Sequence, residues 1–244
     1  MIWEFVFIFI VVLIGGFVQG VSGFGLGLVV MGFLPLILSL KDSTLLVMSL
    51  LLVASLSIAV KTYKHIERRG LFFILVFAIV GRIGAFFVLS TFGDMDFLKQ
   101  WLAFFLIGMV IYLFLSGKKR DINSDIHPII PILLGFFGGF IGGVFAVGGP
   151  FFVFYFLLLY ADKHKYNANM QMTVVVTSSF SLLLHGVNGD FDSSFLTYFL
   201  VGVVATWVGT WLGMKWFERV PSHLIRKFAM ILVLGAAINL LIFG

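Results

Sequence analysis

The sequence Gly15-Gly16-Phe17-Val18-Gln19-Gly20-Val21-Ser22-Gly23-Phe24-Gly25 interrupts a long apolar run near the N-terminus. A related stretch, Gly138-Gly139-Phe140-Ile141-Gly142-Gly143-Val144-Phe145-Ala146-Val147-Gly148, follows 123 positions later, and six of the eleven paired positions are identical. Glycine disfavours a helix by about 1 kcal/mol relative to alanine, so a glycine cluster is a place where an apolar helix can break. The repetition therefore indicates two related halves, each with a helix break near its start.

The composition is typical of an integral membrane protein. Hydrophobic residues make up 61% of the 244 residues and charged residues only 11%, whereas soluble domains contain roughly 25% charged residues. Cysteine is absent, which excludes disulfides, thiolate catalysis and cysteine-based metal sites. The net charge of +5 reflects the placement of loops relative to the membrane. The expected partner is therefore the lipid bilayer, and no nucleic acid is expected.

Eight apolar segments are expected, and two of them are too long for a single crossing of a bilayer. The long segments cover 3–40 and 129–161 and contain the two glycine clusters. A straight helix over 3–40 would measure about 57 Å, against a hydrocarbon core of about 30 Å. Each long segment either crosses once with large overhangs or folds back at its glycines. The six ordinary spans are expected at 43–60, 70–92, 98–116, 168–185, 194–213 and 224–243.

The distribution of lysine and arginine decides between these two arrangements. If each long segment crossed once, eight basic residues would lie on one side of the membrane and seven on the other. If each folds back, thirteen lie on one side and only Lys41 and Lys99 lie opposite. The positive-inside rule favours the second arrangement and makes the side with thirteen cytoplasmic. Both termini are then expected on the non-cytoplasmic side of a bacterial inner membrane.

The predicted fold is all-α, with two inverted repeats in the membrane. Repeat one covers 1–117, repeat two covers 129–244, and a cytoplasmic linker over 118–128 joins them. Each repeat is expected to contain one glycine-broken fold-back helix pair and three transmembrane helices. Because each repeat would begin and end on opposite sides, the second is expected upside down relative to the first. The sequence does not predict the number of subunits, and a homo-oligomer is left open.

The two breaks are predicted to form one anion site near the middle of the membrane. A helix that starts at a break has N–H groups without an intrahelical partner, and its dipole favours an anion there. Ser22 is expected to cap the new helix of the first break, and Pro150 suits the first helical position in the second. The alternative is that the glycines only allow close helix packing, an interpretation that we keep for Gly209 and Gly213. The residues predicted to bind substrate are Gln19, Ser22, Gly23, Phe24, Gly25, Arg82, Val147, Gly148, Gly149 and Pro150.

Two ionisable residues within the expected spans are also candidates for function. Arg82 is the only lysine or arginine inside a span, where it could balance an anion, and an arginine that reaches the interface is the alternative. His185 closes its segment and is the candidate for proton coupling, although a lone histidine at a membrane edge is more often a hydrogen-bonding group. The spans contain no constellation of His, Asp, Glu or Cys. We therefore expect no enzyme activity, no metal and no cofactor.

A run of hydroxyl and amide side chains marks the helix expected at 168–185. Gln171, Ser178 and Ser181 share one face of this helix by their spacing. They could line an anion path, but hydrogen bonding between helices is the favoured interpretation.

The stretch Gly16–Gly25 and the stretch Gly139–Pro150 resemble the two motifs of the sulfite exporter TauE/SafE family, also called the toluene-sulfonate uptake permease family. The resemblance covers the whole chain in architecture, with duplicated four-segment halves and a short hydrophilic linker. It implies transport of small sulfur-containing anions such as sulfite, thiosulfate or sulfonates. Together with the residues, it favours a secondary transporter or facilitator that works by alternating access around a midplane site. An anion channel and a membrane scaffold without transport activity are the alternatives.

Overall fold

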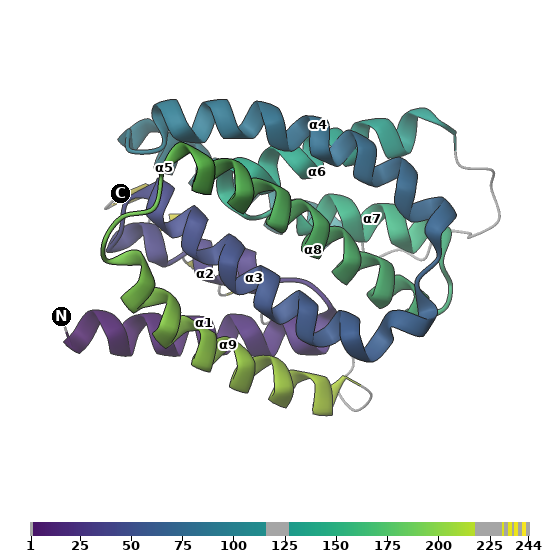
Figure 1. The fold of residues 1–244 in the computed structure, drawn as a ribbon, viewed down its shortest axis with the longest axis horizontal. Coiled ribbons are helices and arrows are strands. Elements are labelled where there is room, and N and C mark those ends of the chain that lie inside the picture. Colours follow the sequence, from purple (N-terminus) through teal and green to yellow (C-terminus); the bar gives the residue numbers. More distant parts are fainter. Residues whose placement is uncertain are drawn as a thin grey trace.

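The computed structural model describes residues 2–115 and 127–217, together with isolated positions between 231 and 242. Every regular element in this part is a helix, and most helices run along the long axis of the molecule (Figure 1). The linker predicted over 118–128 and the span predicted over 224–243 lie almost entirely outside the described residues. The helices are α1 (Ile2–Ser22), α2 (Leu26–Met31), η1 (Leu34–Leu36), α3 (Leu40–Thr62), η2 (Tyr63–His65), α4 (Arg68–Phe92), α5 (Asp96–Leu115), α6 (Ile129–Phe145), α7 (Gly149–Leu159), α8 (Lys163–Asn188) and α9 (Phe195–Trp216).

Five helices of the described part are long and apolar enough to cross a membrane, judged by length and composition. They are α1, α3 with the turn η2, α4, α8 and α9. Helix α8 extends beyond the predicted span 168–185 at both ends. It starts earlier because the side chain of Asp162 accepts hydrogen bonds from the N–H groups of His164 and Lys165 and so caps the helix. The prediction of an all-helical chain with several membrane-spanning helices is confirmed.

Both long apolar segments break inside their glycine clusters. Helix α1 ends at Ser22, and Gly23 (φ 80°) and Gly25 (φ 116°) then take left-handed conformations that side chains beyond glycine rarely adopt. Helix α6 ends at Phe145, and Ala146 follows with φ 55°, the only positive φ at a non-glycine residue in the described ranges. Ala146 is the counterpart of Gly23 in the repeated stretch. The chain therefore turns at the same point of each motif, after which α2 packs on α1 and α7 packs on α6.

Contacts between helix ends show which of them lie together. At one end of the molecule, the backbone N–H of Lys41 at the start of α3 donates to the carbonyl of Gly93 after α4. The ammonium of Lys41 also lies 2.8 Å from the carboxylate of Asp190 after α8. At the opposite end, Asn169 near the start of α8 donates to the carbonyl of His65 after α3. Figure 1 shows the N-terminus at the first end, and α6 and α7 connecting to the second.

Two pairs of helices, α1 with α9 and α4 with α6, pack with their backbones in close contact. A Cβ atom added to Gly209 would overlap the carbonyl of Leu13, and one added to Gly139 would overlap the carbonyl of Ala78. In lipid, such close packing of small residues takes the place of the hydrophobic effect between helices. The packing role predicted for Gly209 is confirmed, and Gly139 of the second motif has the same role.

A methyl group at Gly139 should destabilise the protein, because the backbone of α4 cannot yield without separating the two helices. We expect Gly139→Ala to lower the free energy of unfolding by about 1–3 kcal/mol. Gly108→Ala in α5 is the control, since nothing lies within 4 Å of the added Cβ, and this change should be neutral or slightly stabilising. Thermal unfolding of both variants in the same detergent measures the difference. Equal unfolding midpoints would contradict the packing role.

Candidate functional site

The two breaks meet at a small cavity inside the bundle. The loop of the second break touches α2, since a Cβ atom on Gly27 would overlap the carbonyl of Ala146. The cavity has a volume of about 30 Å³, which is room for about two water molecules. A ligand of only a few non-hydrogen atoms therefore suits it. The residues that line the cavity are Gln19, Phe24, Gly25, Gly27, Leu28, Leu51, Arg82, Ala146, Val147, Gly148, Gly149, Pro150, Phe152, Met170 and Val174.

Eight of the ten predicted substrate-binding residues line this cavity, and Ser22 and Gly23 do not. The hydroxyl of Ser22 lies 2.7 Å from the carbonyl of Val18 and 2.5 Å from that of Phe24, so it is engaged by the chain next to it. Ser22 also does not cap α2, whose N-cap is Gly25 without a side-chain hydrogen bond. The predicted cap is wrong because the hydroxyl donates to the backbone carbonyls of Val18 and Phe24 instead of accepting from the first N–H groups of α2.

The first break is held by two buried glutamines. Gln19 donates through Nε2 to the carbonyl of Gly23 (3.3 Å) and to Oε1 of Gln171 (3.2 Å), and its own Oε1 accepts the N–H of Leu26 (3.3 Å). Gln171 on α8 donates to the carbonyl of Gly23 (2.7 Å) and to Oδ1 of Asn167 (2.9 Å). These bonds use both hydrogens of each amide. Gln19 therefore closes the backbone of the break, and the interpretation of Gln171 as a link between helices is confirmed.

Arg82 on α4 supplies the charge of the cavity and is only 4% exposed. Its Nη1 donates to the carbonyl of Gly142 (2.8 Å) and to Oγ of Ser181 (3.2 Å), and its Nη2 to Oγ1 of Thr177 (3.4 Å). Its Nε has no hydrogen-bond partner among the described residues. No carboxylate lines the cavity. Arg82 does not reach the membrane surface, and a buried charge held only by neutral groups favours an anionic ligand.

The N-terminus of α7 faces the same cavity as Arg82. Gly148 is the N-cap of this 11-residue helix, and Gly149 and Pro150 are its first two residues. All three line the cavity. The first turn of a helix has N–H groups without intrahelical partners and carries the positive end of the dipole. Pro150 occupies the second helical position instead of the predicted first, and α2, with six residues, is too short to offer a comparable dipole.

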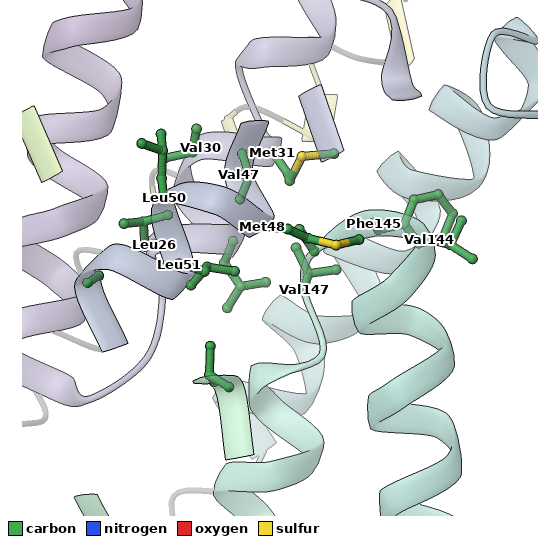
Figure 2. Close-up of a cluster of buried hydrophobic side chains, with 14 of the residues drawn as sticks. Leu26, Val30, Met31, Val47, Met48, Leu50, Leu51, Val144, Phe145 and Val147 are labelled. Atoms are coloured by element: carbon green, nitrogen blue, oxygen red, sulfur yellow. The ribbon is translucent and has the colours of Figure 1, made fainter. Parts of the chain in front are cut away.

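The rest of the cavity wall is apolar, and sequence reasoning missed it. Leu28 from α2, Leu51 from α3, Phe152 from α7, and Met170 and Val174 from α8 all line it. Figure 2 shows Leu51, beside other apolar side chains of α2 and α3, in one buried cluster with Val147 of the second break. Nothing in the sequence distinguishes these residues from ordinary core residues. The cavity thus combines one charged edge with an apolar surface.

Comparison with known proteins identifies the family. The model of the sulfite exporter TauE/SafE family matches residues 8–240. The chain belongs to this family. A relative from Cupriavidus necator, described as a probable sulfite/organosulfonate exporter TauE, is 24% identical over 236 residues, which cover 93% of this chain and 90% of the relative. No solved structure matches the chain.

Membership of the TauE/SafE family makes the protein an integral membrane transporter. The resemblance found in the glycine motifs and the expectation that the chain is not an enzyme are both confirmed.

In this TauE/SafE protein, His185 lies outside the cavity, at the end of α8. The ring is 1% exposed, and its Nδ1 lies 2.6 Å from Oδ2 of Asp190. Oδ1 of Asp190 lies 2.8 Å from Nζ of Lys41, so the three side chains form one partly buried cluster. The ring also packs on Phe86 of α4 at a centroid distance of 4.9 Å, one turn after Arg82. His185 is therefore near the proposed anion site without forming part of its wall.

The pKa of Asp190 lies below its ordinary value. Burial raises this pKa, but hydrogen bonds from Lys41, His185 and Asn188 to the carboxylate lower it by more. Because the folded pKa is below the unfolded one, the carboxylate stabilises the fold at pH values above about 4. This contribution is lost as the pH falls through the folded pKa.

We expect Asp190→Asn to be less stable than wild type near neutral pH and to lose less stability on acidification. The asparagine cannot form the ion pair with Lys41 and does not titrate. Thermal unfolding midpoints from about pH 7 to about pH 3 measure both effects. Asp94→Asn in the turn after α4 is the control, because Asp94 is exposed and lies outside the cluster. Parallel curves for wild type and Asp190→Asn would show that the cluster does not stabilise the fold.

Proposed function

We propose that this protein is a secondary transporter or facilitator of a small anion, namely sulfite or another sulfur oxyanion or organosulfonate. The observation that carries the proposal is the buried guanidinium of Arg82, which has an unpaired Nε and no carboxylate partner in the described chain, at a cavity shared with the N-terminus of α7. An anion bound there would offset the cost of burying the charge. The class of anion is supported by the family and by the relative from Cupriavidus necator.

We propose further that the two halves, 1–117 and 129–244, are inverted repeats. Their helix packing is reciprocal, because α1 of the first half packs on α9 of the second and α6 of the second packs on α4 of the first. Gly16 faces the carbonyl of Thr206, and its counterpart Gly139 faces the carbonyl of Ala78. Ala78 and Thr206 occupy matching places in the two halves, 128 residues apart. This reciprocity supports a two-fold axis in the membrane plane.

Alternating access would arise from rocking of the two halves around the cavity. One ion pair joins the halves at each end of the bundle: Lys41 with Asp190 at the first end, and Glu67 with Lys165 at the second. Opening one pair while the other stays closed would expose the cavity to one side only. The charge distribution of the loops supports a first end that lies outside the cytoplasm, as we also propose for both termini in a bacterial inner membrane.

His185 is our proposed group for proton coupling. In the described spans it is the histidine nearest the cavity, one turn along α8 from Ser181, which accepts a hydrogen bond from Arg82. Its contact with Asp190 links it to the ion pair at the first end. A histidine titrates in the range that a physiological proton gradient spans.

Uptake into proteoliposomes tests the transport proposal. We expect saturable uptake of labelled sulfite and stimulation by unlabelled sulfite trapped inside, because a carrier exchanges its substrate whereas a channel does not. Arg82→Gln should weaken uptake by about tenfold or more, since it removes a charged hydrogen-bond donor from the site.

An imposed proton gradient in the same vesicles, with His185→Gln as the comparison, tests the coupling role.

Linear uptake without exchange would instead favour the anion channel. A folded Arg82→Gln protein with wild-type uptake would remove Arg82 from the site. No uptake of any sulfur oxyanion or sulfonate by the folded wild type would contradict the proposed function.

A second variant fills the cavity without disturbing the helix break. A Cβ atom on Gly149 would lie 3.6 Å from Cβ of Phe24 and 3.7 Å from Cε of Met170, which are ordinary contact distances between cavity-lining residues. We expect Gly149→Ala to fold but to bind the anion about tenfold more weakly, because one methyl group occupies much of so small a site. The stabilisation of thermal unfolding by added sulfite measures binding.

Gly148→Ala is the matched variant for the neighbouring position, where the added Cβ would overlap the carbonyl of Gly138. It should lower the unfolding midpoint even without ligand, whereas Gly149→Ala should not. Unchanged sulfite binding by Gly149→Ala would place the ligand elsewhere.

A further inference from the structure

We infer that the cavity selects oxyanions with one negative charge, bound through one edge of the Arg82 guanidinium, over divalent oxyanions of the same shape. The inference rests on the proposed function and specifies its substrate class. It depends on three observations, namely the charge at the cavity, the donors that Arg82 has left, and the apolar side chains in the rest of the wall.

The charge at the cavity is that of a single group. Arg82 is the only charged side chain that lines it. The nearest ionic cluster, at the end of α8, contains Lys41 and Asp190, which neutralise each other at 2.8 Å. A monovalent anion would therefore leave the site neutral. A divalent anion would bury one uncompensated negative charge, and the cost of desolvating an ion rises steeply with its charge.

The unused donors of Arg82 lie along one edge of its guanidinium. An arginine has five N–H groups. The two on Nη1 are shared among Gly142, Ser181 and the sulfur of Met48, while the contact to Thr177 occupies one on Nη2. The N–H of Nε remains unpaired and buried, and one N–H of Nη2 remains beside it. The N–H of Nε and the neighbouring N–H of Nη2 both lie in the guanidinium plane, along one edge, and a pair of this kind matches two oxygens of one oxyanion.

The apolar part of the wall suits an apolar group. The side chains of Leu28, Leu51 and Phe152 line the cavity and offer no hydrogen-bond donor. A fourth oxygen on the bound anion would lose its water there without a replacement partner. Burying a methyl group or a lone pair on sulfur against this wall would cost much less free energy, because neither gives up a comparable hydrogen bond to water. The site therefore fits an anion whose oxygens gather on one side.

Methanesulfonate and sulfate provide a matched pair of probes. Both are tetrahedral at sulfur and similar in size, but sulfate has a second charge and a fourth oxygen in place of the methyl group. We expect the wild-type protein in detergent to bind methanesulfonate at least about tenfold more tightly than sulfate at neutral pH and constant ionic strength. Calorimetric titration of the purified full-length protein measures both affinities.

Two variants test the physical cause. Leu51→Lys adds a second positive charge to the wall and should shift the affinity ratio towards sulfate by about tenfold, with Leu51→Met as the uncharged control. Arg82→Lys keeps the charge but removes the planar pair of donors. It should weaken methanesulfonate binding more than chloride binding, because chloride does not need two donors.

The outcomes separate this inference from the proposed function. Equal or tighter binding of sulfate by the wild type would overturn the charge selection while leaving a sulfur oxyanion transporter in place. A folded Leu51→Lys protein with the wild-type ratio, or a folded Arg82→Lys protein with unchanged methanesulfonate binding, would also overturn it. If the wild type binds and transports no sulfur oxyanion or sulfonate at all, both proposals fail.

Discussion

Backbone that leaves the helical state inside a bilayer must find its hydrogen-bond partners within the protein, because the surrounding lipid offers none. Each break in this chain finds such partners in the other half of the molecule. The carbonyl of Gly23 in the first break accepts from Gln171 on α8. The carbonyl of Val144, just before the second break, accepts from the hydroxyl of Thr44 on α3 at 3.0 Å. Together with Gln19, which closes the first break from its own side, these contacts show that backbone at each break is satisfied partly by distant segments of the chain.

The two breaks share a backbone course but differ in the chemistry that holds them. The first is closed by neutral amides whose hydrogens are all engaged, whereas the second is approached by a guanidinium with donors to spare. The packing of the motifs differs in a related way. Gly143 lies against Ala85 and the side chain of Arg82, whereas its counterpart Gly20 lies against the backbone of Thr210 and Gly213. Arg82 and Thr210 occupy matching places, 128 residues apart. If the two halves are the inverted repeats that we propose, the charge of Arg82 is a place where one half departs from the other.

The sequence predicts the parts of this arrangement that depend on local signals. Clustered glycines disfavour helix wherever they occur, so both breaks could be located. A lone arginine in an apolar segment is costly anywhere in a membrane, so Arg82 could be singled out. The partner of Gln19 could not be found in this way, because Gln171 lies 152 residues away. Leu51 likewise has no local feature that separates it from the other apolar residues of α3.

The error at Ser22 has the same origin. A serine just before a helix start is a typical N-cap, but here the end of the preceding helix is equally close in sequence. The hydroxyl engages the carbonyls of Val18 and Phe24, and the N–H of Leu26 is left to Gln19. At a break inside one apolar segment, the ends of two helices lie close together in sequence, and the same few polar groups can hydrogen-bond to either end. The three-dimensional course of the turn determines which end each group bonds to.

The side chain of Arg82 takes part both in the packing of the helices and in the proposed anion site. Its Nη1 holds the carbonyl of Gly142 on α6, one turn before the second break. The edge of the same group formed by Nε and Nη2 is the part left for a ligand. An anion that draws on this edge therefore acts on a group that also fixes α6 relative to α4 and α8. In the proposed mechanism, movement of the helices around the cavity and occupancy of the cavity would be coupled through this one rigid, planar group, which a flexible point charge such as lysine would not provide.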